Sequence, residues 1–191
     1  MKKIIFKSLP LLNFKGIRNL HVSFGENLTV ISGRNAAGKT SIADAIMWVL
    51  FDVGYDGNKL EPKTFDKNHE IIKEIPHEAE LTLLVDGDQI VLKRTLTDSW
   101  KGSKCMNTYK YYVNGDVTTA GDFKKVVESI CPDSVFRRIS SATNFCSLPW
   151  QKQRELLESL ADKYTTQDIT QGDERFDFVV EELKKKTIAD L

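Results

Sequence analysis

The sequence predicts an α/β fold in which a β-strand leads through a glycine-rich loop into an α-helix. The loop, residues 33–40, has the sequence Gly-Arg-Asn-Ala-Ala-Gly-Lys-Thr and fits the phosphate-binding pattern G-x-x-x-x-G-K-[ST]. Residues 28–32 before it are rich in β-branched side chains, which is typical of a buried strand, and residues 41–51 after it place apolar side chains at helical spacing. The strand and the helix that flank the loop favour nucleotide binding over a chance match in a structural turn.

The loop carries the residue types that phosphate binding requires. Gly33 and Gly38 can adopt backbone angles that are closed to other residues, so that successive N–H groups turn toward an anion. The first N–H groups of the following helix and the positive end of its dipole also favour phosphate. We expect Lys39 to reach the β- and γ-phosphates of ATP and the Thr40 hydroxyl to bind Mg²⁺. The predicted nucleotide-binding residues of the loop are Gly33, Arg34, Asn35, Ala36, Ala37, Gly38, Lys39, Thr40 and Ser41.

The chain before the loop is expected to form an antiparallel ribbon. Residues 3–12 and 20–24 alternate in the manner of strands, and a turn at residues 18–19 separates them. Two strands that meet at a turn before the nucleotide loop indicate a ribbon beside a mainly parallel ATPase sheet.

The chain after the first helix alternates between polar loops, short strands and amphipathic helices. Residues 52–76 are polar, include Pro62 and Pro76, and are expected to form a mobile surface loop. Apolar alternation and turn dipeptides predict strands, and apolar spacing of three and four residues predicts helices, the first of which Asp122 would cap. The predicted strands cover residues 79–85, 90–94, 109–113 and 117–119, and the predicted helices cover residues 123–130, 150–161 and 176–191.

Composition limits the classes of protein to consider. The chain has 191 residues with 27 basic and 27 acidic side chains, so its net charge of zero provides no general electrostatic attraction for nucleic acid. Three cysteines and three histidines lack the spacing of metal ligands, so we expect reduced thiols and no metal site made by the protein alone. Because no apolar run approaches the roughly 18 residues that a membrane span requires, we expect a cytoplasmic protein without a membrane partner.

A complete ATPase site is not expected within this chain. Phosphate-loop ATPases need a carboxylate after a second apolar strand, where it holds Mg²⁺ and helps to activate water. The apolar runs at residues 81–85 and 126–130 lead instead into Asp86-Gly87 and Cys131-Pro132, which are turn sequences. We therefore assign no catalytic residue to this chain. The other half of the site would come from a later part of the same polypeptide or from a partner.

Three segments of the sequence carry a resemblance to a known superfamily. They are Asn-Phe-Lys-Gly at residues 13–16, the loop with its following serine at residues 33–41, and Ile-Ala-Asp-Ala-Ile at residues 42–46. Together they resemble the amino-terminal ATPase segment of the SMC/RecF/SbcC superfamily. Residues 145–157 are similar to the F-x-x-L-x-W-x-x-[QR]-R-x-x-L segment of SbcC-like ATPases, including those of phages and prophages.

The resemblance implies an architecture and further site residues. It implies the amino-terminal lobe of an ABC-type head over residues 1–174, with a mixed sheet, an antiparallel β-ribbon and a helical subdomain, and the start of a coiled-coil helix over residues 175–191. Lys15 would lie near the nucleotide phosphates, whereas a lysine that is simply solvated at a strand end is the alternative. A glutamine that the family often places before the F-x-x-L segment, against Mg²⁺, is absent from residues 139–144, and Ala36 replaces a frequent glycine.

The resemblance also implies a function. The chain would be the ATP-binding half of a composite ABC-type ATPase in DNA double-strand break repair or recombination, with ATP and Mg²⁺ as cofactors. ATP would bring two heads together as a homodimer, with DNA and a nuclease subunit as further partners. Hydrolysis of ATP would require both the carboxy-terminal half and the second head.

A self-contained phosphate-loop kinase or GTPase-like module is the alternative. Such a module would carry its own acceptor or base-recognition site within the chain. Residues 58–61, Asn-Lys-Leu-Glu, come near the base-reading pattern N-K-x-D, but glutamate replaces the aspartate and the surrounding sequence is irregular. Nucleotide turnover by this chain alone would separate the two hypotheses.

Overall fold

The computed structural model describes residues 2–66, 68, 70–102, 104–140, 145–146 and 148–160. The chain divides into two compact units, residues 1–136 and 137–191, of which the first holds the sheet and the phosphate loop. The predicted helix over residues 176–191, the coiled-coil start at residue 175 and the domain boundary at residue 174 lie outside the described residues.

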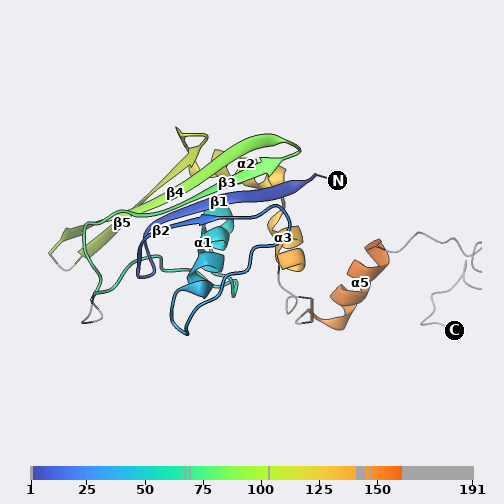
Figure 1. Cartoon of the computed structure of the whole chain (residues 1–191), viewed down its shortest axis with the longest axis horizontal. Helices are drawn as coiled ribbons and strands as arrows, with labels where there is room; N and C mark the ends of the chain where they lie inside the picture. Colours follow the sequence, from blue (N-terminus) through green and yellow to red (C-terminus); the bar gives the residue numbers. More distant parts are fainter. Residues whose placement is uncertain are drawn as a thin grey trace, which may run out of the picture. The chain divides into compact units, whose positions relative to one another are not determined.

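The first unit is built on a six-stranded sheet in which all neighbouring strands are antiparallel. The strand order is β2-β1-β3-β4-β5-β6 (Figure 1). Two-residue turns join β1 to β2, β3 to β4 and β5 to β6. The strands are β1 (Ile4–Phe14), β2 (Ile17–Ser23), β3 (His77–Val85), β4 (Asp88–Lys101), β5 (Lys104–Val113) and β6 (Asp116–Thr118).

Two helices complete the core of this unit, α1 (Lys39–Phe51) and α2 (Ala120–Ile130). Every second residue of β3 from its first residue is buried, because alternate side chains of a strand point to opposite faces of the sheet. Trp48 of α1 and Phe123 of α2 lie in the same buried cluster, and the ring centre of Trp48 is 5.5 Å from that of Phe14 on β1. This packing fixes α1 against the sheet, with the phosphate loop directly before its first residue.

Most of the predicted elements are confirmed, namely the β1–β2 ribbon, the later strands, α1 and α2. The turn predicted at residues 18–19 is wrong, because both residues lie in β2 and the chain turns at residues 15–16, where Gly16 has a left-handed φ of 86°. The start of α2 differs from the prediction, because the helix begins at Ala120 and its N-cap is Thr119. The N–H of Asp122 donates a hydrogen bond to the Thr119 hydroxyl oxygen over 3.1 Å, so Asp122 is the capped residue and not the cap.

The predicted strand over residues 28–32 is wrong in this chain. The run has no regular secondary structure, and Leu28 and Val30 are 80% and 78% exposed. The mainly parallel sheet predicted beside the ribbon is also not found among the described residues, because two-residue hairpins impose antiparallel pairing. Residues 28–32 therefore lack a parallel neighbour in the described part of the chain.

Residues 52–76 form an irregular segment, as predicted, but part of it is buried. Residues 62–64 are all buried beside the turn between β1 and β2. There the carbonyl oxygen of Pro62 accepts a hydrogen bond from the Lys15 N–H over 3.0 Å. The segment therefore holds this turn, while its mobility stays a prediction.

The second unit contains α5 (Trp150–Leu160), and α3 (Asp133–Ser140) crosses the boundary between the units. The side chain of Gln153 donates hydrogen bonds to the carbonyl oxygens of Phe145 and Leu148 over 3.1 and 2.9 Å, which ties the start of α5 to the preceding residues. The helix predicted at residues 150–161 is confirmed over residues 150–160, and residue 161 lies outside the described residues. None of the described helices combines the length and the apolar character needed to cross a bilayer.

Candidate nucleotide-binding site

The phosphate loop turns its backbone into the start of α1. Gly38 has a φ of 88° and is the N-cap of this helix, and Ala36 has a φ of 62°. Both values are left-handed, which glycine adopts readily and alanine adopts only under strain. No side chain caps α1, so the N–H groups of its first turn lack a side-chain acceptor. This geometry leaves several backbone donors free to bind an anion.

The side chain of Lys39 folds back over the loop. Its ammonium group donates hydrogen bonds to the carbonyl oxygens of Gly33 and Arg34 over 2.9 and 2.7 Å. A phosphate in the loop would offer charged oxygen atoms to the same ammonium group in place of two neutral carbonyl groups, and such charge-assisted hydrogen bonds are stronger.

The structure brings the predicted loop residues together at the surface of the first unit. Residues 33–37 and Thr40 are exposed, and Gly38, Lys39 and Ser41 are half-buried. An open loop of this kind can receive phosphate, but it does not exclude water from the reacting group as closed phosphoryl-transfer sites do. The contact of each loop residue with nucleotide stays a prediction.

The turn between β1 and β2 lies beside the phosphate loop. A methyl group added at Gly38 would lie 3.4 Å from the side chain of Ile17, the first residue of β2. Lys15 in the same turn reaches α1, where its ammonium nitrogen lies 2.6 Å from Oδ2 of Asp44. Lys15 is therefore ion-paired to the helix of the phosphate loop and not simply solvated, while its contact with nucleotide stays a prediction.

Asp44 is a residue of this region that was not assigned from the sequence. It is buried on α1, and its Oδ1 accepts a hydrogen bond from the Tyr55 N–H over 2.9 Å while Oδ2 faces Lys15. The signal in the sequence was a carboxylate within the apolar pattern of the helix, because a buried carboxylate requires partners. The partners themselves come from distant segments of the chain, which the pattern alone could not identify.

Hydrogen bonds from residues 52–76 hold the turn that carries Lys15. Asn13 and Lys15 have left-handed φ values of 50° and 46°, which asparagine tolerates but lysine adopts only under strain. The Thr64 hydroxyl donates to the carbonyl oxygen of Asn13 over 2.8 Å and accepts from the Gly16 N–H over 3.3 Å. These contacts stabilise a backbone that would otherwise relax, so the position of Lys15 is well determined.

The described residues contain no group of three or more His, Cys, Asp or Glu side chains that could hold a metal ion. Thr40 therefore stays the predicted Mg²⁺ ligand of this chain. Both carboxylate oxygens of Asp44 already have protein partners. Residues 141–144, which fall in the segment where the family places its glutamine, lie outside the described residues.

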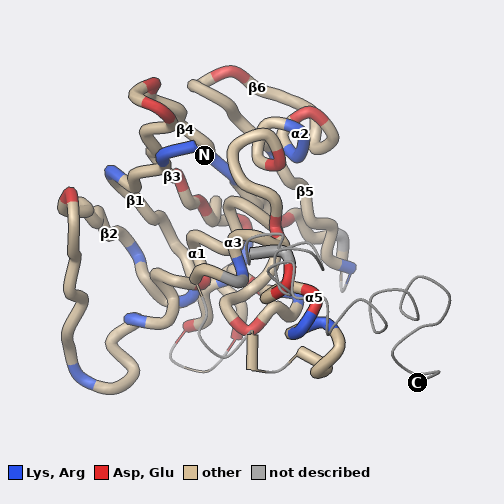
Figure 2. The backbone as a smooth tube through the Cα atoms, turned by 90° about the vertical axis from the view of Figure 1, so that its right-hand side faces the viewer, with Lys and Arg blue, Asp and Glu red and all other residues tan. Residues whose placement is uncertain are grey.

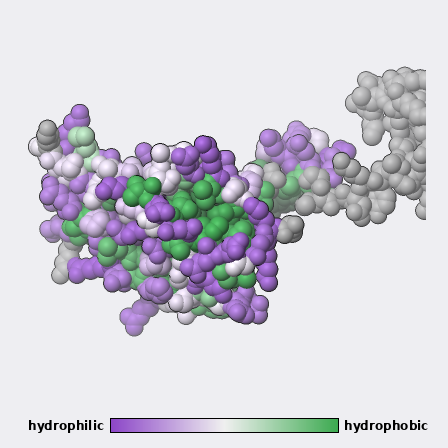
Figure 3. All heavy atoms as spheres, turned by 90° about the horizontal axis from the view of Figure 1, so that it is seen from above, coloured by the Kyte–Doolittle hydropathy of each residue, from purple (hydrophilic) through white to green (hydrophobic). Residues whose placement is uncertain are grey.

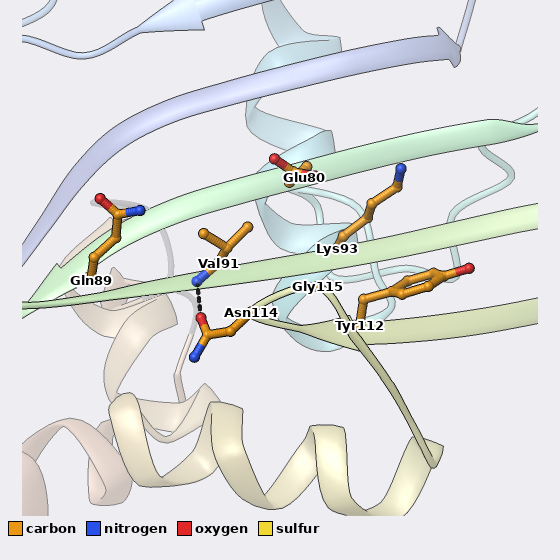
Figure 4. A pocket seen from close by; sticks show the side chains of 7 residues that line it. All are labelled: Glu80, Gln89, Val91, Lys93, Tyr112, Asn114 and Gly115. Carbon is orange, nitrogen blue, oxygen red and sulfur yellow. Dashed lines mark hydrogen bonds between the residues drawn. The ribbon is translucent and has the colours of Figure 1, made fainter.

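A hollow of about 670 Å³ lies on the sheet and is not lined by the phosphate loop (Figure 4). Two of its polar side chains, those of Lys93 and Asn114, are paired within the protein. The Lys93 ammonium lies 2.6 Å from a carboxylate oxygen of Glu78, and the Asn114 side chain accepts a hydrogen bond from the Val91 N–H over 2.8 Å. The view from above in Figure 3 shows apolar residues gathered over the middle of the molecule, with hydrophilic residues around them. We assign no nucleotide chemistry to this hollow, whose lining residues are Glu80, Gln89, Val91, Lys93, Tyr112, Asn114 and Gly115.

Comparisons with known proteins agree with the geometry of the loop. Residues 8–189 match the family described as AAA domain. The chain is 29% identical over 134 residues to the DNA double-strand break repair Rad50 ATPase of Archaeoglobus fulgidus, covering 70% of this chain and 13% of that protein. It is 25% identical over 190 residues to the protein of the same name from Methanocaldococcus jannaschii, covering 96% of this chain and 18% of that protein.

A third curated protein and a solved structure are also similar to this chain. The chain is 31% identical over 87 residues to the DNA replication and repair protein RecF of Lachnoclostridium phytofermentans, covering 46% of this chain and 22% of that protein. A solved SMC ATPase structure has the same fold over 82% of this chain and 99% of that chain, with a TM-score of 0.55 and 20% identity. The predicted α/β fold of an ABC-type head lobe is thereby confirmed.

The chain spans 13% to 22% of the length of these three curated relatives. The specific likeness to phage and prophage SbcC proteins stays a prediction. The matched range includes the loop at residues 33–40, whose nucleotide contacts stay a prediction. The chain therefore belongs to the AAA domain family and is an amino-terminal ATPase segment of the SMC/RecF/SbcC superfamily.

Proposed function

We propose that the phosphate loop binds ATP together with Mg²⁺. The observation that carries this proposal is the left-handed Gly38 at the uncapped start of α1, with the Lys39 ammonium lying over the same loop. Thr40 in the first turn of the helix would supply a hydroxyl ligand to Mg²⁺. Lys15, in the neighbouring turn, would add a second positive charge near the phosphates.

The ATPase would be composite, with this chain as its ATP-binding half. Two observations support this reading. The run over residues 28–32 is apolar but exposed, as expected of a strand whose neighbours belong to another segment. The described residues near the loop also present no unpaired cluster of carboxylates for Mg²⁺ and water. A carboxy-terminal half and a second head would supply the missing strand neighbours and the missing carboxylates.

The process that fits these features is DNA double-strand break repair or recombination. Two of the similar proteins, which the alignment matches over 70% and 96% of this chain, are named DNA double-strand break repair Rad50 ATPases. DNA would be the substrate of the assembled protein, two heads would associate as a homodimer on ATP, and a nuclease subunit would be a further partner. The assembled protein would act in the cytoplasm.

The proposal predicts that this chain binds ATP but hydrolyses almost none of it. Phosphoryl transfer depends on positioned charge and an oriented water molecule, and the loop supplies only the phosphate cradle. Affinity is measured by isothermal titration calorimetry with Mg²⁺ and ATP, and hydrolysis by release of phosphate from the purified chain. We expect saturable binding with turnover far below the ordinary enzyme range of about 1 s⁻¹ or more.

Two outcomes would contradict the proposal. Turnover near 1 s⁻¹ by the isolated chain would favour a self-contained kinase or GTPase-like module. Absence of ATP binding in a folded chain would remove the nucleotide site itself. The matched control is Lys39→Ala, whose unliganded fold is expected to remain intact, because Lys39 lies outside the buried core.

A further inference from the structure

Asp44 joins three segments that are distant in the sequence. It lies on α1, its Oδ2 binds the Lys15 ammonium at 2.6 Å, and its Oδ1 accepts the Tyr55 N–H at 2.9 Å. The carboxylate is almost fully buried, with 7% of its side chain exposed, whereas the Lys15 side chain is 34% exposed. A buried carboxylate without its cation strongly destabilises the folded protein. Because separating the pair is costly, this contact restrains Lys15 more firmly than a surface ion pair would.

The restraint acts close to the phosphate loop. Asp44 follows Lys39 by five residues on the same helix, a rise of about 7.5 Å. Ile17, directly after the turn with Lys15, borders the loop, since a Cβ atom added at Gly38 would lie 3.4 Å from its side chain. The Lys15 ammonium is thereby held beside α1, about one and a half helical turns from Lys39. The free movement of Lys15 is limited by the same contact.

We propose that Asp44 is a positioning residue that holds Lys15 toward a nucleotide in the phosphate loop. Asp44 itself does not touch the nucleotide, because both of its oxygens are bound to protein groups. This inference rests on the proposed function and adds that the contribution of Lys15 to nucleotide binding depends on Asp44. Nucleotide affinity then depends on Asp44 only as long as residue 15 carries its ammonium group.

The test is a double-mutant cycle on ATP affinity, measured by calorimetry with Mg²⁺ on the whole chain. Lys15→Met is expected to weaken ATP binding about tenfold, and Asp44→Asn about fivefold. Combining the two should weaken it no further than Lys15→Met alone. Asp44→Glu, which keeps the charge but displaces the carboxylate by one methylene group, gives a second test with about a threefold loss that disappears in the Lys15→Met background.

Asp98 provides a matched control. It is also a buried aspartate, and its two oxygens accept the Glu74 N–H at 2.9 Å and the indole N–H of Trp100 at 2.6 Å. It lies on the part of β4 that pairs only with β5, beyond the last residue paired with β3. Asp98→Asn should lower the melting temperature and leave ATP affinity unchanged.

Several results would overturn the inference. Unchanged or tighter ATP binding in Asp44→Asn would do so, and so would losses that multiply in the double variant. The same loss of affinity in Asp98→Asn would show a general effect of stability. Unimpaired binding by Lys39→Ala would instead overturn the proposed nucleotide site, so the two failures are distinguishable.

Discussion

Lys39 is a residue whose charge can be removed without opening the core, because its ammonium lies on two loop carbonyls. ATP with Mg²⁺ at about 100 times its dissociation constant should stabilise the chain by about 2.7 kcal/mol, which corresponds to a rise of roughly 5–11 °C in melting temperature. We expect Lys39→Ala to abolish this rise while the unliganded melting temperature stays near that of the original chain. Differential scanning fluorimetry with and without ATP measures both quantities.

The control for this prediction is Lys124→Ala. Lys124 lies on α2 with its side chain 77% exposed, and its distance to the Glu128 carboxylate is 3.9 Å. Its removal takes away one positive charge of the same kind without touching the loop. A thermal shift that persists in Lys39→Ala, or that disappears in Lys124→Ala, would show that the loop charge does not determine binding.

Two glycines allow opposite predictions from the space around them. A Cβ atom at Gly54 would lie 2.9 Å from the Asp56 carboxylate and 3.3 Å from Oδ1 of Asp44, whereas one at Gly121 in α2 would meet only the Thr119 hydroxyl at 3.9 Å. Gly54→Ala should therefore lower the free energy of unfolding by about 1–3 kcal/mol. Gly121→Ala should raise it by about 0.5–1 kcal/mol, because alanine favours the helix.

Urea unfolding of the two alanine variants measures these changes directly. Since each variant adds one methyl group, each serves as the volume control of the other. A gain in stability for Gly54→Ala would mean that Asp44 and Asp56 can both move away without loss. The close contact at Gly54 would then have no structural importance.

The roles of some residues can be predicted from the neighbouring sequence, whereas the roles of others cannot. Gly38 and Lys39 belong to a pattern that is complete within eight consecutive residues, so the loop and their roles in it could be predicted from the sequence. The ion pair of Lys15 with Asp44 joins positions 29 residues apart. Its existence depends on how the β1–β2 turn packs on α1, which no local pattern encodes.

The C-terminal end of α1 is held by a buried ion pair with unequal partners. Arg94 on β4 is 5% exposed and its Nη1 lies 2.5 Å from a carboxylate oxygen of Asp52, the C-cap of α1, whose side chain is 54% exposed. The guanidinium carbon of Arg94 also lies 5.0 Å from the ring centre of Tyr111. Burial lowers the pKa of Arg94 while Asp52 opposes that shift, and the group remains a cation at ordinary pH.

This asymmetry predicts which half of the pair is more important for stability. Asp52→Asn leaves a buried guanidinium without its counter-charge and should lower the free energy of unfolding by about 2–3 kcal/mol. Arg94→Met keeps apolar volume in the core and leaves an aspartate that water can solvate, so it should cost about 1 kcal/mol or less. Guanidinium chloride unfolding of the two variants compares them. A larger loss for Arg94→Met would show that contact of the cation with the rings dominates.

At the scale of elements, predictability followed the distance between pairing partners. The hairpins β3–β4 and β5–β6 close through Asp-Gly and Asn-Gly turns, so both partners and the turn were visible in one short stretch. The run over residues 28–32 has the composition of a strand, but a strand also needs a neighbour, and the described sheet offers none. Its composition was interpreted correctly, whereas its pairing could not be known from this chain.

At the scale of the molecule, charge sets the expectation for DNA. Basic and acidic side chains are interspersed along the described chain (Figure 2), in keeping with a net charge of zero. We expect this chain alone to bind duplex DNA only weakly, in the salt-sensitive non-specific range of about 10⁻⁴ to 10⁻⁶ M. The proposed function predicts that DNA affinity rises only when a carboxy-terminal half is supplied and ATP is present, since the joined heads would then present a common basic surface.

Fluorescence anisotropy with a labelled duplex at two salt concentrations tests this prediction. The isolated chain is compared with the chain plus its carboxy-terminal half, each with and without ATP. Binding by the isolated chain that is tight, independent of ATP and resistant to salt would point to a DNA-reading surface within these residues. If the DNA affinity of the chain with its carboxy-terminal half did not change with ATP, DNA binding would not depend on the association of two heads, and the prediction would be wrong.

The exposed run over residues 28–32 has a consequence for the solubility of the isolated chain. Leu28 and Val30 are largely exposed, and the run lies outside the sheet, so it can act as a template for any extended segment that reaches it. A copy of the same run on another molecule is one such segment. Self-association of residues 28–32 therefore competes with their pairing to the proposed carboxy-terminal half. The balance between the two shifts with protein concentration. Dilute samples would stay monomeric for longer, while concentrated ones would aggregate through the surface that the proposed composite ATPase would need for its own assembly.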